Sequence, residues 1–508
     1  MMILSSTPTP VQAEEATIYL TGLFMYGEEQ AGDTSALAFL RDFNRGTADF
    51  ERCTGSYRMR IVYPDGKEIY FADNAGIMRW YIGPKGFFTA LREAAPDNSS
   101  PNEAAIAQFL YYGCIYSPET VLREVRRTDP GKYYLLEKGN VREKEKGLAP
   151  LEDLDAPEDA LAVQMRRFAQ SVSGREDIAC TITGGTDSRA ILSHMIHCGL
   201  HPLLDITGKP TDSDVVIAKK IAERLDAKLL FIRDSPEEEN WLKKTVQEAD
   251  GMTGVCGLYR LYKKASRLPE EGIILECGGL NGEMYKNSFI NQDYPFYGGN
   301  PRWEHFLRFK VLTYDFPVHI CGSRLVAVMK KTPMATLEWL RSHTGRTKAN
   351  AYLSAGYDIL QGRSSAVSAM NSRHYIPYTP LMERVVVASM FRQNPYSLEM
   401  QAFQRKQVTV FCPEIKDIET DRGLTCASGR MAAECVKSTV YLCNVALGRA
   451  FRRKKVATRI DACFEEGLSS PQYRAALERC KELGIIAPDV KDLPMGIADR
   501  VFALGTIL

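Results

Sequence analysis

The chain has 508 residues and a formal charge of +1, with 64 Lys and Arg against 63 Asp and Glu. This length exceeds what one hydrophobic core usually supports, so two or three domains are expected. Hydrophobic residues make up 45% and charged residues 25%, which excludes a largely disordered or collagen-like chain. The balanced charge provides no global attraction to nucleic acid or to an anionic membrane.

The 13 cysteines are scattered and never spaced C-x-x-C, which favours reduced, buried thiols over a disulfide framework or a zinc ribbon. The N-terminal stretch lacks the basic start and the apolar segment of a secretory signal, and no apolar run is long enough to cross a bilayer. We therefore expect a cytoplasmic protein without a membrane span.

The sequence from about Ala16 to Val141 is rich in predicted strands. In "GSYRMRIVYPDGKEIYFADNAG", apolar and aromatic residues alternate from Tyr57 to Tyr63, Asp65-Gly66 marks a turn, and Ile69 and Phe71 resume the alternation. This pattern predicts a β-hairpin. "NEAAIAQFLYYG" predicts a helix and "KYYLLE" another strand, after which the charged stretch "EKEKGLAPLEDLDAPED" is typical of a linker.

Strands and helices alternate after this linker. "IACTIT", "LLDIT", "KLLFI" and "GIILECG" predict buried strands, whereas "SRAILSHMIHCG" and "SDVVIAKKIAERLDA" predict helices. This alternation predicts a doubly wound parallel sheet, which binds ligands at the carboxyl ends of its strands. From about Trp303 the sequence is mostly helical, and a tail from about Ala427 fits no clear pattern.

The stretch "TITGGTDSR" lies where a predicted strand ends and a helix begins, a place where free N–H groups and the helix dipole attract anions. Gly184 and Gly185 permit a tight turn close to a ligand, and Thr183 and Ser188 add hydroxyl groups. Asp187 suits a Mg²⁺ ion that accompanies phosphate groups. The spacing matches neither a Walker A loop nor a Rossmann loop. The alternative is an ordinary glycine-rich turn in which Asp187 or Ser188 caps the helix.

"TGGTDS" resembles the S-G-G-x-D-S loop of the PP-loop ATP pyrophosphatases, and more of the chain resembles their asparagine synthetase-like branch. "LDITGKPTDSDVVIAKKIAERLDAKLLFI" is similar to that family's second strand and its D-x-x-x-A-x-x-(I/V)-A helix. "FERCTGSYRMRIVYPDGKEIYFADNAGIMRWYI" and "FLYYGCIYSPETVLREVRRTDPGKYYLL" resemble its N-terminal glutaminase domain. "NSRHYIPYTPLMERVV" and "FCPEIKDIETDRGL" resemble later synthetase segments, so the resemblance covers about Ala16 to Leu424.

The resemblance implies an α/β protein with three parts. Residues 1–145 would form a degenerate Ntn-hydrolase-like α+β sandwich, residues 155–426 a doubly wound PP-loop (HUP-like) synthetase domain, and residues 427–508 a helical C-terminal extension. Family members use ATP and Mg²⁺ to convert a carboxylate into an acyl-adenylate with release of pyrophosphate, and ammonia or an amine then attacks. The implied partners are a small-molecule or peptide carboxylate, an amine or ammonia donor, and a second copy of the chain in a homodimer, with no nucleic acid.

The resemblance also assigns residues to ligands. Asp187 would hold Mg²⁺ and take part in catalysis, and the main chain of Ile182, Thr207 and Gly278 would pack on the adenosine. The pyrophosphate would bind to Thr183, Gly184, Gly185, Thr186, Asp187 and Ser188.

The start of the chain departs from the family pattern. The family's glutaminase uses a cysteine that becomes the N-terminal residue, whereas this chain begins Met1-Met2 and its first cysteine is Cys53. We therefore expect no glutaminase activity by that route, with ammonia supplied from outside or an amine on the substrate as the nucleophile.

The family's third motif, S-G-x-G-(S/A)-D-E, is also altered and reads "CGGLNGEMY". Gly278 and Glu283 align, but Gly282 replaces the aspartate that usually supplies a second Mg²⁺ ligand. Glu283 is the substitute expected at that metal, with a surface glutamate at a helix start as the alternative. The lysine that usually neutralises the phosphates has no clear counterpart, and Arg422 in "TDRGL" is the nearest candidate.

These departures leave two other functions open: a catalytically silent relative that binds nucleotide or a partner protein, and a PP-loop enzyme that adenylates a nucleic-acid base. Two further signals have simpler interpretations. His194 and His197 lie three residues apart, as a metal pair can, but packing explains them better. The basic run "GRAFRRKKVATR" is more typical of a solvated helical face than of a membrane or nucleic-acid contact.

Overall fold

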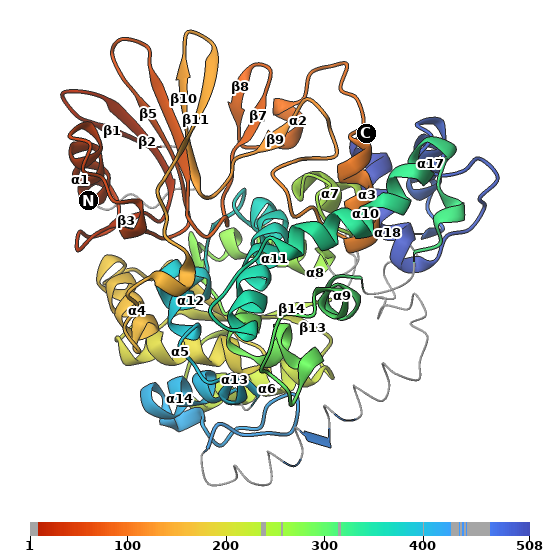
Figure 1. Ribbon diagram of the computed structural model, residues 1–508. Coiled ribbons are helices and arrows are strands. Elements are labelled where there is room, and N and C mark those ends of the chain that lie inside the picture. Colours follow the sequence, from red (N-terminus) through yellow and green to blue (C-terminus); the bar gives the residue numbers. More distant parts are fainter. Residues whose placement is uncertain are drawn as a thin grey trace.

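The computed structural model describes residues 9–234, 240–255, 258–312, 316–399, 401–427, 436, 439–440, 443 and 468–508. The described part is mixed α/β, as the sequence predicts. Figure 1 shows the N-terminal strands as a β-rich region at the top, with the helices of the later chain below and beside it.

The N-terminal region is built on a six-stranded antiparallel sheet with the order β1-β2-β5-β6-β10-β11. Its strands are β1 Thr9–Gln12, β2 Thr17–Gly22, β5 Tyr57–Val62, β6 Glu68–Ala72, β10 Lys132–Glu137 and β11 Asn140–Glu145. The predicted hairpin is confirmed, because β5 pairs with β6 and places Met59 opposite Phe71 and Ile61 opposite Ile69. These four side chains are buried with Phe39 of helix α1 (Asp33–Asn44) in one apolar cluster.

Smaller elements complete this region. They are β3 Met25–Tyr26 with β4 Cys53–Thr54, β7 Tyr81–Gly83 with β8 Gly86–Phe88 and β9 Arg126–Arg127, and helices α2 Leu91–Ala94 and α3 Glu103–Tyr112. The predicted helix α3 is confirmed, with both ends set by local chemistry. The Asn102 side chain accepts a hydrogen bond from the Ala105 N–H, and Gly113 ends the helix with φ 72°.

The central part of the chain forms a five-stranded parallel sheet with the order β14-β13-β12-β15-β16. Its strands are β12 Ile178–Thr181, β13 Leu203–Gly208, β14 Leu229–Arg233, β15 Leu275–Cys277 and β16 Ile376–Tyr378. The chain runs outward from β12 on one side and then returns to the other side of β12 with β15. The sheet therefore has a switch point between β12 and β15, where such sheets bind ligands.

Helices surround this sheet and join it to the N-terminal region. They are α4 Ala160–Ser171, α5 Thr186–His197, α6 Ser213–Arg224, α7 Trp241–Glu248, α8 Leu258–Glu270, α9 Trp303–Phe306, α10 Ser323–Arg341, α11 Lys348–Asn371, α12 Arg384–Met390, α13 Pro395–Glu399, α14 Ala402–Phe411, α17 Pro471–Glu482 and α18 Met495–Ile507. Helix α14 packs on α5, and α10 packs on α3.

The C-terminal helices are part of the main structure. Helix α18 contacts α17, α3 and α7, and Figure 1 shows α17 and α18 beside α10 and α3. Side chains of α18 such as Val501 and Phe502 belong to a continuous apolar cluster that also contains Phe109 of α3 and Ile178 of β12. One core therefore connects the first, central and last parts of the described chain.

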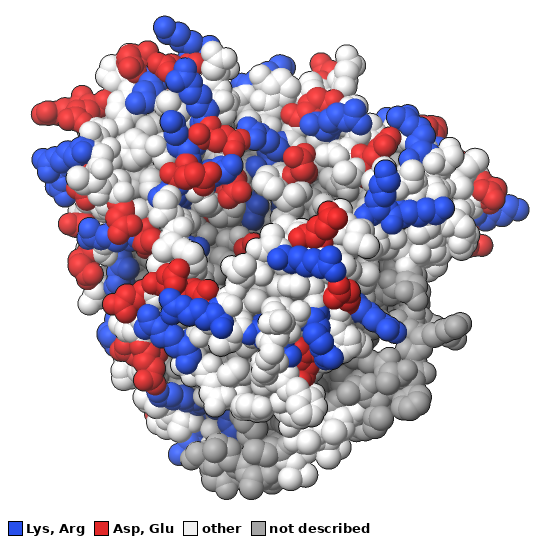
Figure 2. All heavy atoms as spheres, viewed as in Figure 1, with Lys and Arg blue, Asp and Glu red and all other residues white. Residues whose placement is uncertain are grey.

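Within the described ranges, no helix combines the length and apolar character needed to cross a bilayer. The basic run "GRAFRRKKVATR" lies outside the described residues. On the face shown in Figure 2, Lys and Arg side chains are interspersed with Asp and Glu, in keeping with the formal charge of +1.

Candidate functional site

Two loops meet at the switch point of the parallel sheet. The first joins β12 to α5, and the second follows β15 and leads into a 3₁₀ helix, Gly282–Tyr285. Their backbones approach so closely that a Cβ atom at Gly279 would lie 2.5 Å from the Ser188 nitrogen. The strand order thus brings together the glycine-rich loop and the altered third motif, which lie almost a hundred residues apart in the sequence.

Hydrogen bonds within the chain shape the first loop. The Gly184 N–H donates to Asp214 Oδ1 (2.8 Å), the Thr183 N–H to Ser188 Oγ (3.1 Å) and the Gly185 N–H to Thr183 Oγ1 (3.2 Å). The two hydroxyl groups that the sequence offered as ligand donors therefore hold the loop in its turn. Asp214 is the first residue of the D-x-x-x-A-x-x-(I/V)-A motif in α6, which follows β13. This aspartate therefore has a structural role in holding the first loop.

The start of α5 leaves hydrogen-bond donors open. Its N-cap is Gly185, which has no side chain, so the alternative in which Asp187 or Ser188 caps the helix is wrong. In the described part of the chain, no side chain accepts a hydrogen bond from the N–H groups of Thr186, Asp187 or Ser188. These N–H groups and the positive end of the helix dipole favour an anion here.

Asp187 forms a polar cluster with two residues that the sequence did not reveal. Lys286 Nζ lies 2.5 Å from Asp187 Oδ2, and Gln404 Nε2 lies 3.0 Å from Asp187 Oδ1. Gln404 belongs to α14 and is fully buried. Its Oε1 atom is buried without a hydrogen-bond partner. No local pattern in the sequence marks Lys286 as a partner of Asp187, and only the fold brings the two side chains together.

The two carboxylates expected to hold magnesium, those of Asp187 and Glu283, each interact with a different positively charged side chain. Glu283 is half-buried, and its carboxylate interacts electrostatically with Arg363 of α11. Across the described residues, no group of three or more His, Cys, Asp or Glu side chains is arranged to hold a metal ion. Because the Lys286 ammonium lies against one oxygen of Asp187 and repels a second cation there, these residues fit a magnesium ion bound directly to that carboxylate poorly.

A buried arginine places the segment of Arg422 beside the first loop. Arg189 is fully buried and donates to the carbonyl groups of Ile418 (2.6 Å), Glu419 (2.7 Å) and Gly184 (3.2 Å). The Asp421 N–H also donates to the Gly184 carbonyl (3.1 Å). Burial lowers the pKa of the Arg189 guanidinium. Arg422 is exposed in the turn that this network holds against the loop, so the structure brings the predicted cation near the predicted anion site.

The three residues expected to contact adenosine lie on adjacent strands or just beyond them. The Ile182 N–H donates to the Asp205 carbonyl of β13 (3.0 Å), and the Gly278 N–H donates to the Tyr378 carbonyl of β16 (3.1 Å). Thr207 lies near the end of β13, and its buried hydroxyl has no hydrogen-bond partner. An unpaired buried hydroxyl at this edge is a polar group that a ligand can satisfy.

A buried charged cluster ties the three central strands together. Thr181 Oγ1 lies 3.0 Å from both carboxylate oxygens of Asp205, 2.9 Å from Glu276 Oε1 and 2.8 Å from Lys264 Nζ. Burial raises the pKa of Asp205 to about 6. The buried Lys264 ammonium, 3.5 Å from Glu276 Oε2, offsets part of the negative charge of the two carboxyl groups. The cluster fixes the strands that carry both loops.

His194 has a packing role. Its Nε2 atom lies 2.8 Å from Gln407 Oε1, and its ring lies 4.1 Å from that of Phe411. The ring of His197 lies 5.0 Å from that of Phe411. Burial lowers the pKa of His194 to about 4, which favours a neutral ring against α14.

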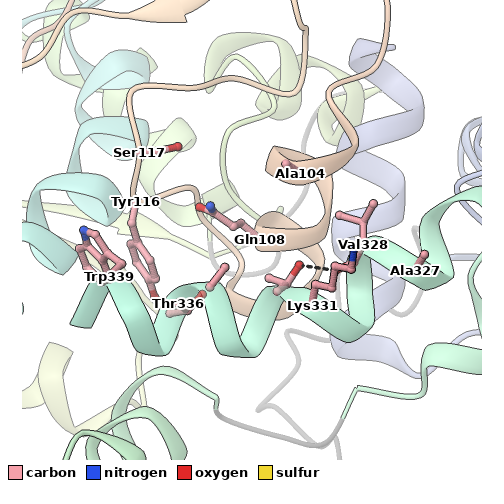
Figure 3. Close-up of a pocket in the computed structure, with 11 residues that line it drawn as sticks. Ala104, Gln108, Tyr116, Ser117, Ala327, Val328, Lys331, Thr336 and Trp339 are labelled. Carbon is pink, nitrogen blue, oxygen red and sulfur yellow. Dashed lines mark hydrogen bonds between the residues drawn. The ribbon is translucent and has the colours of Figure 1, made fainter. Parts of the chain in front are cut away.

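A separate groove of about 410 Å³ lies between α3 and α10 (Figure 3). Tyr116 and Trp339 stack beside it with ring centroids 5.4 Å apart, and Gln108, Ser117 and Lys331 are its polar lining residues beside Thr332 and Thr336. The lining residues include none of the predicted site residues. This groove is therefore distinct from the meeting point of the two loops.

The chain matches no protein-family model, and no curated protein matches its sequence. The functional interpretation therefore depends on the motifs in the sequence and on the geometry of the two loops.

Proposed function

We propose that the protein is an ATP-dependent carbon–nitrogen ligase of asparagine synthetase type. It activates a small-molecule or peptide carboxylate as an acyl-adenylate, and ammonia or a substrate amine then forms the amide. In this proposal the N-terminal region is a degenerate Ntn-like domain, and the parallel-sheet region is a PP-loop domain.

One observation carries the proposal: the glycine-rich loop and the third motif meet at the switch point of a parallel sheet. Gly279 lies against the backbone of Asp187 and Ser188, where any larger residue would collide. The loop is preshaped by Asp214, and no side chain in the described ranges caps the start of α5. These features suit the terminal phosphates of a nucleotide.

The chemistry of the proposed first step follows from this placement. A carboxylate oxygen of the substrate attacks the α-phosphorus of ATP, the bond to the oxygen that bridges the α- and β-phosphates breaks, and pyrophosphate leaves. The N–H groups of α5 and the nearby cations stabilise the charge on the departing pyrophosphate. The amine then attacks the acyl carbon and AMP leaves, with the amine proton passing to solvent or to the leaving group.

The first cysteine of the chain does not supply a glutaminase nucleophile in this proposal. Cys53 is buried in β4, and burial raises the pKa of its thiol to about 12. A thiol in such surroundings stays protonated and is a poor nucleophile. Ammonia from solution or an amine on the substrate is therefore the proposed nitrogen source.

The test is the formation of AMP and pyrophosphate from ATP with a panel of carboxylates and amines. We compare the native chain with Gly279→Ala, whose new methyl group would meet the Ser188 backbone, and with Gly298→Ala, where no atom lies within 4 Å. The expected result is product formation by the native chain and Gly298→Ala and its loss in Gly279→Ala. Release of ADP and phosphate, or equal activity of both variants, would contradict the proposal.

A catalytically silent nucleotide-binding relative is the second candidate. The observation that favours it is the ion pair between Asp187 and Lys286, together with Gly282 at the position where the family motif has an aspartate. ATP binding without AMP formation across the panel would support this candidate over the ligase.

A further inference from the structure

Position 282 lies so close to the Asp187 carboxylate that only a glycine fits there. The positively charged side chain that contacts Asp187 is instead that of Lys286. A Cβ atom on Gly282 would lie 2.0 Å from Asp187 Cγ and 2.4 Å from each carboxylate oxygen. A side chain at position 282 would therefore overlap the Asp187 carboxylate. Lys286, which follows the 3₁₀ turn, reaches the same carboxylate with its Nζ atom at 2.5 Å.

The Asp187 carboxylate is held on both sides. Lys286 binds one oxygen, and the fully buried Gln404 donates to the other. The side chains of Lys286 and Asp187 are only 17% and 20% exposed, so their attraction is screened less than that of a surface pair. A magnesium ion bound directly to Asp187 would be repelled by the adjacent ammonium group.

The Lys286 ammonium retains capacity for another ligand. It carries three N–H donors, and Asp187 is its hydrogen-bond acceptor in the described part of the chain. The pair sits at the first turn of α5, beside the open N–H groups of Thr186 to Ser188. Two neighbouring buried amides also have unpaired atoms, Gln404 Oε1 and Asn281 Nδ2, as expected where a bound molecule completes a polar site.

We propose that the Lys286 ammonium, held by Asp187 and Gln404, binds the phosphates of the nucleotide and takes the place of a magnesium ion bound by the protein. Lysine serves well as a point charge for phosphate. Asp187 is then a positioning residue that orients Lys286, and any magnesium arrives with the nucleotide. This inference rests on the proposed function, because it requires a nucleotide at the first loop.

The experiment measures ATP binding by calorimetry, once in excess EDTA and once in excess Mg²⁺, for the native chain, Lys286→Gln, Lys286→Arg and Asp187→Asn. Lys330→Gln, on the exposed face of α10, is the matched control. We expect the native chain and the control to bind ATP in both buffers. Loss of one charge-assisted contact should weaken binding by Lys286→Gln in EDTA about 10- to 100-fold. Lys286→Arg and Asp187→Asn, which keep the positive charge, should retain most of the affinity in EDTA.

Manganese binding followed by electron paramagnetic resonance provides a second readout. Without ATP, we expect the native chain to bind no Mn²⁺ at this site, whereas Lys286→Gln, which lacks the ammonium group that faces Asp187, should bind it. ATP binding by the native chain that requires Mg²⁺, is unaffected by Lys286→Gln and is lost in Asp187→Asn would overturn the inference and leave the proposed function intact. Failure of the native chain to bind ATP in either buffer would instead refute the proposed function.

Discussion

Replacement of Arg189 by methionine is expected to loosen the turn that carries Arg422 and to destabilise the protein. Arg189 is fully buried, and its guanidinium donates to three backbone carbonyl groups. Three charge-assisted hydrogen bonds at about 1.5 kcal/mol each sum to about 4.5 kcal/mol, and the cost of burying the guanidinium offsets part of this. We therefore expect Arg189→Met to lower the free energy of unfolding by about 3 kcal/mol.

Urea denaturation measures this loss, and hydrogen exchange locates it. Exchange should accelerate in residues 418–421, and ATP affinity should fall because the Gly184 carbonyl loses its buried donor. Arg224→Met is the matched control, because exposed Arg224 also donates to a backbone carbonyl, that of Glu414 (2.9 Å). Its effect should stay within about 0.5 kcal/mol. Unchanged exchange in residues 418–421 of Arg189→Met would refute the assignment of Arg189 as the link between this turn and the loop.

Three other buried charged or polar groups support further predictions. Burial raises the pKa of Glu383 from 4.5 to about 8, so its contribution to stability is complete below pH 4.5 and is lost as the pH rises to 8. Glu383→Gln should flatten the fall in melting temperature between pH 4.5 and 8, and parallel curves would contradict this. Burial lowers the pKa of His194 from 6.5 to about 4, so its contribution to stability is present above pH 6.5 and is lost as the pH falls through 4. Between pH 6.5 and 4, the melting temperature of His194→Gln should therefore fall less than that of the native chain. Asp250→Ala removes the buried carboxylate that lies 2.6 Å from Arg373 Nη2 and accepts from the Leu91 N–H (3.1 Å), and loss of these two partners should cost about 2 kcal/mol in urea denaturation. Arg373→Met in the Asp250→Ala background should then cost less than Arg373→Met alone, and equal costs would contradict the pairing.

Local patterns in the sequence predict those parts of the fold that local chemistry decides. The hairpin of β5 and β6 follows from alternation of buried residues around Asp65-Gly66, and α3 follows from Asn102 and Gly113 at its ends. The central strands are continuous apolar runs, and their parallel pairing follows from the helices between them. The glycine-rich loop could be recognised because Gly184, Gly185 and the neighbouring hydroxyl residues come directly after an apolar strand and before a helix.

Contacts between distant segments could not be predicted in this way. Lys286 and Gln404 meet Asp187 across 99 and 217 residues, and neither has a local pattern that indicates a partner. Arg189 resembles any other residue in the first turns of a helix until the fold places the 418–421 carbonyl groups around it. The packing of α18 on α3 likewise joins the C-terminal helix to residues 103–112, and the two sequences show no feature that links them.

The altered third motif has a consistent electrostatic explanation. Two acids facing each other at a phosphate site repel one another and the nucleotide unless a divalent cation lies between them. With Gly282 in place of an acid, Asp187 is alone in this role, and Lys286 balances its charge at 2.5 Å without a metal. Under the proposed function, the glycine at position 282 and the lysine at position 286 therefore support each other, because either one alone would leave the loop junction with an unbalanced charge. Gly282 is thus compatible with an active site in which a lysine, in place of a protein-bound magnesium ion, balances the phosphate charge. The metal dependence of ATP binding distinguishes such a site from one in which two acidic side chains hold the metal.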